Sequence, residues 1–139
     1  GPCLLKDTMQ LSSFYNHKFS LSHSAMAINE DLPIFMIKKL SEKYDLRKKT
    51  VGVLGLSFKA ENDDIRDSSS IKLLKYLKSK KIRTLQSDEY YKDKNNIDKN
   101  LLVKKSDIII ISTPHRAYKN LKISKKKILI DVWGFVEKK

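Results

Sequence analysis

The chain has 139 residues, 40% of them hydrophobic, which is enough for one domain with a modest core and a short appendage. No apolar run approaches the roughly 18 residues of a membrane span and no signal-peptide pattern opens the chain, so we expect a cytoplasmic protein without a membrane partner. The net charge of +13 comes mainly from scattered lysines, whereas arginine is the usual reader of bases and phosphates, so a nucleic-acid binder is the least favoured interpretation.

Two helices are predicted at the start of the chain, over residues 4–15 and 20–44. The second helix carries apolar residues three or four positions apart, at Ala25, Ile28, Leu32, Phe35, Met36 and Leu40. This spacing is typical of one apolar face that is buried against a partner, and we expect a homodimer through this helix. Pro33 lies inside the same helix and predicts a kink or a break near Asp31.

A charged linker at residues 42–49 separates this helical segment, residues 1–48, from a second domain, residues 49–139. In the second domain short apolar runs alternate with polar segments: strands are predicted at 50–54, 82–85, 107–112 and 127–132, a helix at 68–80, and a loop with a short helix at 90–100. Unbroken runs such as Ile108 to Ile111 are typical of parallel strands covered on both faces. The alternation predicts an α/β domain with a Rossmann-like, doubly wound parallel sheet.

The first strand-to-helix junction of this domain, residues 55–70, carries groups that suit a phosphate-bearing ligand. Gly55 lets the backbone approach closely, the start of the following helix offers unpaired N–H groups, and Lys59 and Arg66 supply positive charge. The turn is not a G-x-G-x-x-G fingerprint, so we do not expect this domain to hold a dinucleotide by itself.

The single cysteine, Cys3, lies four residues before Asp7, which is one helical turn. It cannot form an internal disulfide, and two interpretations stay open: a small buried hydrophobe, or a nucleophile whose thiolate is favoured by a helix N-terminus and by Lys6. Asp7 also allows two roles. It can reach a water beside the thiol, or it can satisfy backbone N–H groups at the helix start.

Together these segments resemble the UDP-glucose/GDP-mannose dehydrogenase family of nucleotide-sugar dehydrogenases. The family's nucleophile segment reads roughly Gly-x-Cys-Phe-Pro-Lys-Asp, which matches Gly1 to Asp7 with Leu5 in place of the proline. Its last domain opens with Gly-Leu-x-Phe-Lys and then Asp-Asp-x-Arg-x-Ser, which matches residues 55–68. The resemblance also includes Asn29 with Pro33, Asp88 with Tyr90, and Thr113-Pro114-His115. It covers about the last third of such an enzyme, and the Gly1-Pro2 start also fits a cloning scar.

The resemblance implies an NAD-dependent UDP-glucose or UDP-sugar 6-dehydrogenase that makes polysaccharide precursors by oxidising the C6 alcohol to a carboxylate in two steps. Cys3 would trap the aldehyde as a thiohemiacetal and then carry the thioester, with Lys6 and Asp7 as catalytic neighbours. NAD would be bound mainly by an N-terminal domain absent from this chain, with Arg66 reaching the cofactor; no metal is implied. We therefore expect this chain alone to form no NADH from NAD and UDP-glucose, and an absorbance assay tests this.

Three residues match family positions that contact the nucleotide sugar: Phe58, Lys59 and Trp133. Trp133 stands where many members carry an arginine against the diphosphate, so its indole would stack on a base or a sugar instead. Core packing for Phe58 and a salt bridge from Arg66 to a neighbouring aspartate are structural alternatives. We expect His115 to cap the helix that follows it. The alternative function is a non-catalytic nucleotide-binding or interaction module of the same fold.

Overall fold

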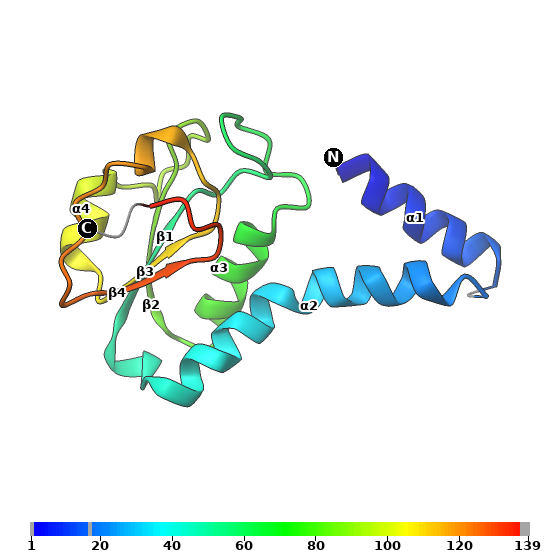
Figure 1. Ribbon diagram of the computed structural model, residues 1–139, viewed down its shortest axis with the longest axis horizontal. Helices are drawn as coiled ribbons and strands as arrows, with labels where there is room; N and C mark the ends of the chain where they lie inside the picture. Colours follow the sequence, from blue (N-terminus) through cyan, green and yellow to red (C-terminus); the bar gives the residue numbers. More distant parts are fainter. Residues whose placement is uncertain (1, 17, 137–139) are drawn as a thin grey trace.

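The computed structural model describes residues 2–16 and 18–136 (Figure 1). Gly1, the first residue of the matched nucleophile segment, lies outside the described residues. The helices are α1 (Pro2–Phe14), α2 (Ser20–Lys43), α3 (Ser69–Ser79) and α4 (Lys99–Lys105), and the strands are β1 (Thr50–Leu54), β2 (Arg83–Ser87), β3 (Ile108–Ile111) and β4 (Ile128–Asp131). Two short 3-10 helices are η1 (Leu46–Lys48) and η2 (Arg116–Tyr118). Within this described part no helix is long and apolar enough to cross a membrane.

The strands form one parallel sheet in the order β2-β1-β3-β4, with helices on both faces. The four isoleucines of β3 are fully buried and alternate between two cores. Ile108 and Ile110 pack with residues of α2 and α3, whereas Ile109 and Ile111 pack with residues of α4 and η2. A strand covered on both faces has no polar side, which explains its unbroken apolar sequence. The predicted doubly wound α/β fold is confirmed.

Of the predicted kink or break near Asp31, the break is absent: α2 runs through Pro33 as one helix, and its ribbon changes direction along its length (Figure 1). Proline removes one backbone N–H from a helix and crowds the preceding turn, so tertiary packing has to hold such a helix together. Pro33 is itself buried, and Ile37 and Leu40 in the following turns belong to the sheet domain's core. Helix α1 packs on the first half of α2, and the two form a hairpin that extends away from the sheet (Figure 1).

The apolar stripe predicted on α2 is not buried as one unit. Leu40 is buried, but Ile28, Leu32 and Phe35 are 69%, 58% and 54% exposed. Their spacing places these three side chains on one face of the helix. We call Ile28, Leu32 and Phe35 the exposed α2 face; it has no cover within the described part of the chain.

The predicted position of the short helix in the polar segment 90–100 was wrong. Helix α4 begins only at Lys99 and continues to Lys105, and the residues before it form a loop. The start is set by Asp98, whose Oδ1 accepts hydrogen bonds from the N–H groups of Asn100 at 2.9 Å and Leu101 at 3.0 Å. Leu102 and Val103 then pack against the sheet, which supplies the stabilisation that so short a helix lacks alone.

Candidate functional site

Polar residues gather at the carboxyl edge of the parallel sheet, where all four strands end. The segments there are the long loop 55–68 after β1, Asp88 to Tyr91 after β2, the turn 112–115 after β3, and Val132 to Gly134 after β4. In open α/β sheets this edge is where ligands bind, because loops from several strands converge on one crevice. The candidate site is therefore built from these four segments.

Gly55 directs the loop after β1 across this edge. Its φ is +84°, in the left-handed region, and its N–H donates to the carbonyl oxygen of Ser87 at 2.9 Å. A Cβ at this position would lie 2.5 Å from the Thr113 carbonyl oxygen and 2.8 Å from the Thr113 nitrogen. Only glycine satisfies both the backbone angle and the close passage of the β3 turn.

Asp88 is the buried anchor of the site. Its Oδ2 accepts hydrogen bonds from the N–H groups of Leu56 at 2.5 Å and Ser57 at 3.1 Å, and its Oδ1 accepts from Tyr90 and Tyr91, both at 2.8 Å. Burial alone would raise the pKa of this carboxyl, but the hydrogen bonds from His115 and from the backbone N–H groups outweigh it and hold the pKa well below its usual range. Asp88 is therefore an ionised group inside the protein, and it ties the loop after β1 to the loop after β2.

His115 does not cap the following helix, so that prediction was wrong. The side chain makes no capping bond to η2 and is fully buried instead. Its Nε2 lies 3.2 Å from both Asp88 Oδ2 and Ser57 Oγ, and its Nδ1 accepts a hydrogen bond from the Glu61 N–H at 3.0 Å. The ring lies between Tyr90 and Tyr118, with centroids 5.0 and 5.4 Å away.

Glu61 bonds the tip of the same loop to the segments that follow β2 and β3. Its φ is +57°, an angle that L-residues seldom adopt, and its carboxylate accepts from the Tyr90 hydroxyl at 2.5 Å and from the Arg116 N–H at 2.8 Å. The Tyr90 hydroxyl first, and then the Arg116 N–H, lower the pKa of Glu61. The loop after β1 is thus bonded to the segments after both β2 and β3.

Phe58 and Lys59 stand on this fastened loop with their side chains in solvent. Phe58 is 37% exposed, so the alternative of core packing is not what the structure shows. Lys59 is exposed, and among the described residues no carboxylate forms an ion pair with it. The structure therefore leaves an exposed aromatic residue and an exposed lysine without an ion pair at consecutive positions of this loop at the carboxyl edge.

Arg66 makes the salt bridge that was considered as a structural alternative, and its partner is Asp64. The guanidinium donates from Nε to Oδ1 at 3.0 Å and from Nη2 to Oδ2 at 2.6 Å, which lowers the pKa of Asp64 to about 2. The pKa of Arg66 is raised, first by this hydrogen-bonded pair and to a smaller extent by an electrostatic interaction with Cys3. The first turn of α1 therefore lies within electrostatic range of the loop, and Figure 1 shows the start of α1 on the same side of the domain as this loop.

Cys3, Lys6 and Asp7 lie in the first two turns of α1. Cys3 is exposed, so it is not a small buried hydrophobe. Lys6 Nζ lies 3.9 Å from Asp7 Oδ1, and both side chains are 64% exposed. Cys3 and Asp7 are one helical turn apart, with the cysteine at the helix start as expected. Asp7 lies past the first turn, where it is badly placed to satisfy the free N–H groups of the helix start.

Trp133 is placed at the carboxyl edge by the turn after β4. Its backbone N–H donates to Asp131 Oδ1 at 3.2 Å, and its indole Nε1 donates to the Ser112 carbonyl oxygen at 3.0 Å. The residue remains 61% exposed, so the orientation of the indole is fixed while much of its surface faces solvent. That combination suits stacking on a flat ligand group.

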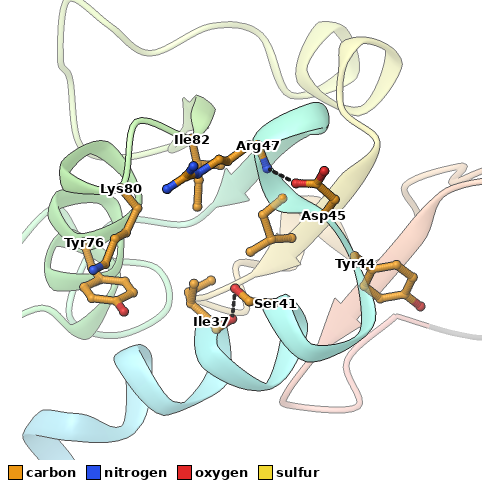
Figure 2. A pocket seen from close by; sticks show the side chains of 9 residues that line it. Ile37, Ser41, Tyr44, Asp45, Arg47, Tyr76, Lys80 and Ile82 are labelled. Carbon is orange, nitrogen blue, oxygen red and sulfur yellow. Dashed lines mark hydrogen bonds between the residues drawn. The ribbon is translucent and has the colours of Figure 1, made fainter.

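A cavity of about 400 Å³ lies at the opposite edge of the sheet (Figure 2). It is lined by residues that precede β1 and β2, such as Arg47 and Ile82, and by Ile37 of α2 and Tyr76 of α3. Figure 2 shows Ser41 donating to Ile37 and the Arg47 N–H donating to Asp45, which are local helix and cap bonds. None of the residues that the sequence predicted for the site lines this cavity.

A doubly wound sheet whose polar loops meet at the carboxyl edge defines a Rossmann-like ligand-binding domain. Residues 52–138 match the family model described as the UDP binding domain of the UDP-glucose/GDP-mannose dehydrogenase family. The chain belongs to that family, as the sequence motifs predicted.

Relatives of this chain are nucleotide-sugar dehydrogenases about three times its length. It is 31% identical to the UDP-N-acetyl-D-mannosamine dehydrogenase of Pyrococcus horikoshii, over 94% of this chain and 34% of that protein. It is 30% identical to the UDP-glucose 6-dehydrogenase of Rickettsia felis, over 99% of this chain and 36% of that protein. The solved UDP-D-ManNAc dehydrogenase structure from Pyrococcus horikoshii matches with a TM-score of 0.86 at 27% identity, over 100% of this chain and 36% of that one.

The sequence did not predict the roles of two buried residues of the site, Asp88 and His115, in joining its loops. Asp88 directly follows β2 and was noted only as a family match. A polar residue placed immediately after a strand is the signal that points to the carboxyl edge. Asp88 satisfies it, whereas His115 lies further along the turn after β3, which ends at Ile111. What sequence could not show is that the two side chains meet, since they are 27 residues apart.

Proposed function

We propose that this chain is the C-terminal part of an NAD-dependent UDP-sugar 6-dehydrogenase of the cytoplasm, acting in the synthesis of polysaccharide precursors. Residues 49–139 would hold the nucleotide sugar, and residues 1–48 would belong to a central domain that carries the nucleophile. The observation that carries the proposal is the exposed pair Phe58 and Lys59, held at the carboxyl edge by a loop that buried Asp88 anchors. An unpaired lysine beside an aromatic ring suits a diphosphate joined to a base or a sugar.

In the proposed reaction the Cys3 sulfur adds to the C6 aldehyde of the sugar and forms a thiohemiacetal, whose oxidation leaves a thioester on the same sulfur. Water then cleaves the thioester, with Asp7 one turn away to take its proton, and the products are the carboxylate and the free thiol. Lys6, whose Nζ lies 3.9 Å from Asp7 Oδ1, would place a positive charge beside the reacting groups. The two hydrides that leave the sugar carbon would be taken up by two molecules of NAD, one in each oxidation.

Arg66 fits a contact with NAD because its guanidinium is exposed, is held by Asp64 and lies within electrostatic range of Cys3. The loop 55–68 lacks a dinucleotide fingerprint, so the main cofactor surface would belong to a domain outside this chain. Trp133 would take the place of a diphosphate-binding arginine and stack on the base or the sugar, which would give this protein a substrate preference of its own.

Replacing Lys59 with alanine should weaken binding of UDP to this chain about tenfold, because a charge-assisted hydrogen bond to a phosphate contributes about 1.5–3 kcal/mol. Calorimetric titration of UDP measures the change. Lys125→Ala, an exposed lysine before β4, removes the same charge at the other edge of the sheet and should leave the Kd within about twofold. In a longer enzyme Lys59→Ala should raise the KM for the UDP-sugar and leave the KM for NAD nearly unchanged. Equal losses in both variants would contradict the assignment.

We also propose that the exposed α2 face is the interface of a homodimer, since three large apolar side chains on one helix face are unfavourable in water. Light scattering at high micromolar concentration should give twice the mass of one chain, and Leu32→Glu should shift the mass to that of a monomer. Ala27→Glu adds the same charge to an exposed position of α2 outside that face and should leave the dimer intact. A monomeric mass for the unsubstituted chain would count against this interface.

A further inference from the structure

We propose that His115 is a positioning residue that sets where Lys59 stands, and that it does so in its neutral form with the proton on Nε2. The inference rests on the proposed function of the loop as the nucleotide-sugar contact. The imidazole is fully buried and joins segments that follow three different elements: Ser57 and Glu61 after β1, Asp88 after β2, and its own turn after β3. No other described side chain is bonded to both halves of the loop tip and to Asp88.

The hydrogen bonds around the ring determine its tautomer. The Glu61 N–H can only donate, so the Nδ1 that it meets at 3.0 Å must be the unprotonated nitrogen. The proton of a neutral ring is then on Nε2, which faces Asp88 Oδ2 and Ser57 Oγ, both at 3.2 Å. Ser57 Oγ already donates its own proton to the Lys59 carbonyl oxygen at 2.9 Å, so it accepts from Nε2. Every donor around the ring therefore meets an acceptor.

These bonds hold the backbone on both sides of Lys59. On one side His115 orients Ser57, whose hydroxyl donates to the Lys59 carbonyl; on the other side His115 accepts from the N–H of Glu61, two residues further on. Glu61 has a φ of +57°, which the chain adopts only where its surroundings hold it. The lysine forms no described ion pair, and Asp64 acts on it only through longer-range electrostatics, so its place in the site is set chiefly by this backbone. Lys59 is thus aimed by a residue far from it in the sequence.

The two halves of the imidazole can be removed separately. In His115→Asn the side-chain oxygen lies near the position of Nδ1 and can still accept from Glu61, whereas in His115→Gln the side-chain nitrogen lies near Nε2 and can still donate to Asp88. His115→Phe keeps a ring between Tyr90 and Tyr118 but makes neither bond. Ser57→Ala removes the hydroxyl that joins Nε2 to the Lys59 carbonyl but leaves Nε2 its bond to Asp88, so it is the mildest of the four changes.

Amide hydrogen exchange of Glu61 and the Kd for UDP are measured in each variant, with the Tyr90 and Tyr91 amides, which bind Asp88, as the internal reference. We expect His115→Asn to keep the Glu61 protection and the UDP affinity within about threefold of the original chain, whereas His115→Gln and His115→Phe lose about tenfold in both. Ser57→Ala should weaken UDP binding severalfold while leaving the thermal midpoint almost unchanged. This pattern would not arise from a general loss of stability, which would expose all three amides together.

Equal loss of Glu61 protection in the Asn and Gln variants, or UDP affinities that follow the thermal midpoints, would overturn the proposal and leave His115 a purely structural residue. So would failure of His115→Asn to fold while His115→Gln folds. If the unsubstituted chain does not bind UDP, the proposed function fails, and the exchange pattern still decides whether His115 holds the loop.

Discussion

Gly55→Ala should lower the free energy of unfolding by at least about 3 kcal/mol, because two separate costs add at this position. An L-residue at a φ of +84° is strained, at about 1–2 kcal/mol. The new Cβ would also lie 2.5 Å from the Thr113 carbonyl oxygen and 2.8 Å from its nitrogen. These are backbone atoms, so no side-chain rotation relieves the overlap, and the carboxyl edge of the sheet must move.

Gly134 offers a matched control for this prediction. Its φ of +61° is also in the left-handed region, but a Cβ there would meet nothing within 4 Å. Gly134→Ala therefore carries only the backbone cost, partly offset by the lower entropy of the unfolded chain, and should lose about 1 kcal/mol or less. Urea unfolding of the two variants and the original chain gives both numbers. Similar losses at the two positions would show that the close approach to Thr113 is not what selects glycine at position 55.

Asp88→Asn should destabilise the fold by about 3–5 kcal/mol at pH 7, although it changes a single atom. Both carboxylate oxygens accept from two backbone N–H groups, those of Leu56 and Ser57 on one side and those of Tyr90 and Tyr91 on the other. An amide offers one oxygen and one NH₂, so in either orientation its NH₂ faces two buried donors. Asp98→Asn is the control, because asparagine caps a helix as well as aspartate and the loss should be under about 0.5 kcal/mol.

The loss of stability caused by Asp88→Asn depends on pH, and the sign of this dependence follows from the lowered pKa of Asp88. A carboxyl with a depressed folded-state pKa stabilises the protein fully above its unfolded value, near 3.9, and loses that contribution as the pH falls toward the folded value. The stability difference between the original chain and Asp88→Asn should therefore be largest at neutral pH and shrink below about pH 4. Unfolding measured at pH 7 and pH 3 tests this. A difference that stays constant would mean that the ionised carboxylate is not the source of the stabilisation.

The sequence by itself determined the strands, the fold class and the family of this protein. A strand buried on both faces favours apolar residues at every position, so Ile108 to Ile111 stands out without any knowledge of its neighbours. The motifs at Gly1 to Asp7 and at residues 55–68 can likewise be read from the sequence, because the residues of each family motif lie close together in the chain. Helix α4 was misplaced because its apolar residues are few and its stability comes from packing.

Only the tertiary structure decided what the polar residues at the carboxyl edge do. His115 was predicted to be a cap because its neighbours in sequence suggest a helix start, whereas its actual partners, Ser57 and Asp88, are 58 and 27 residues away. Of the two outcomes expected from Pro33, a kink or a break, the break is absent because Ile37 and Leu40 in the turns that follow are held in the core of the sheet domain. Local sequence reports on propensity and pattern, and long-range contacts override both wherever a buried polar group must find its partner in another element.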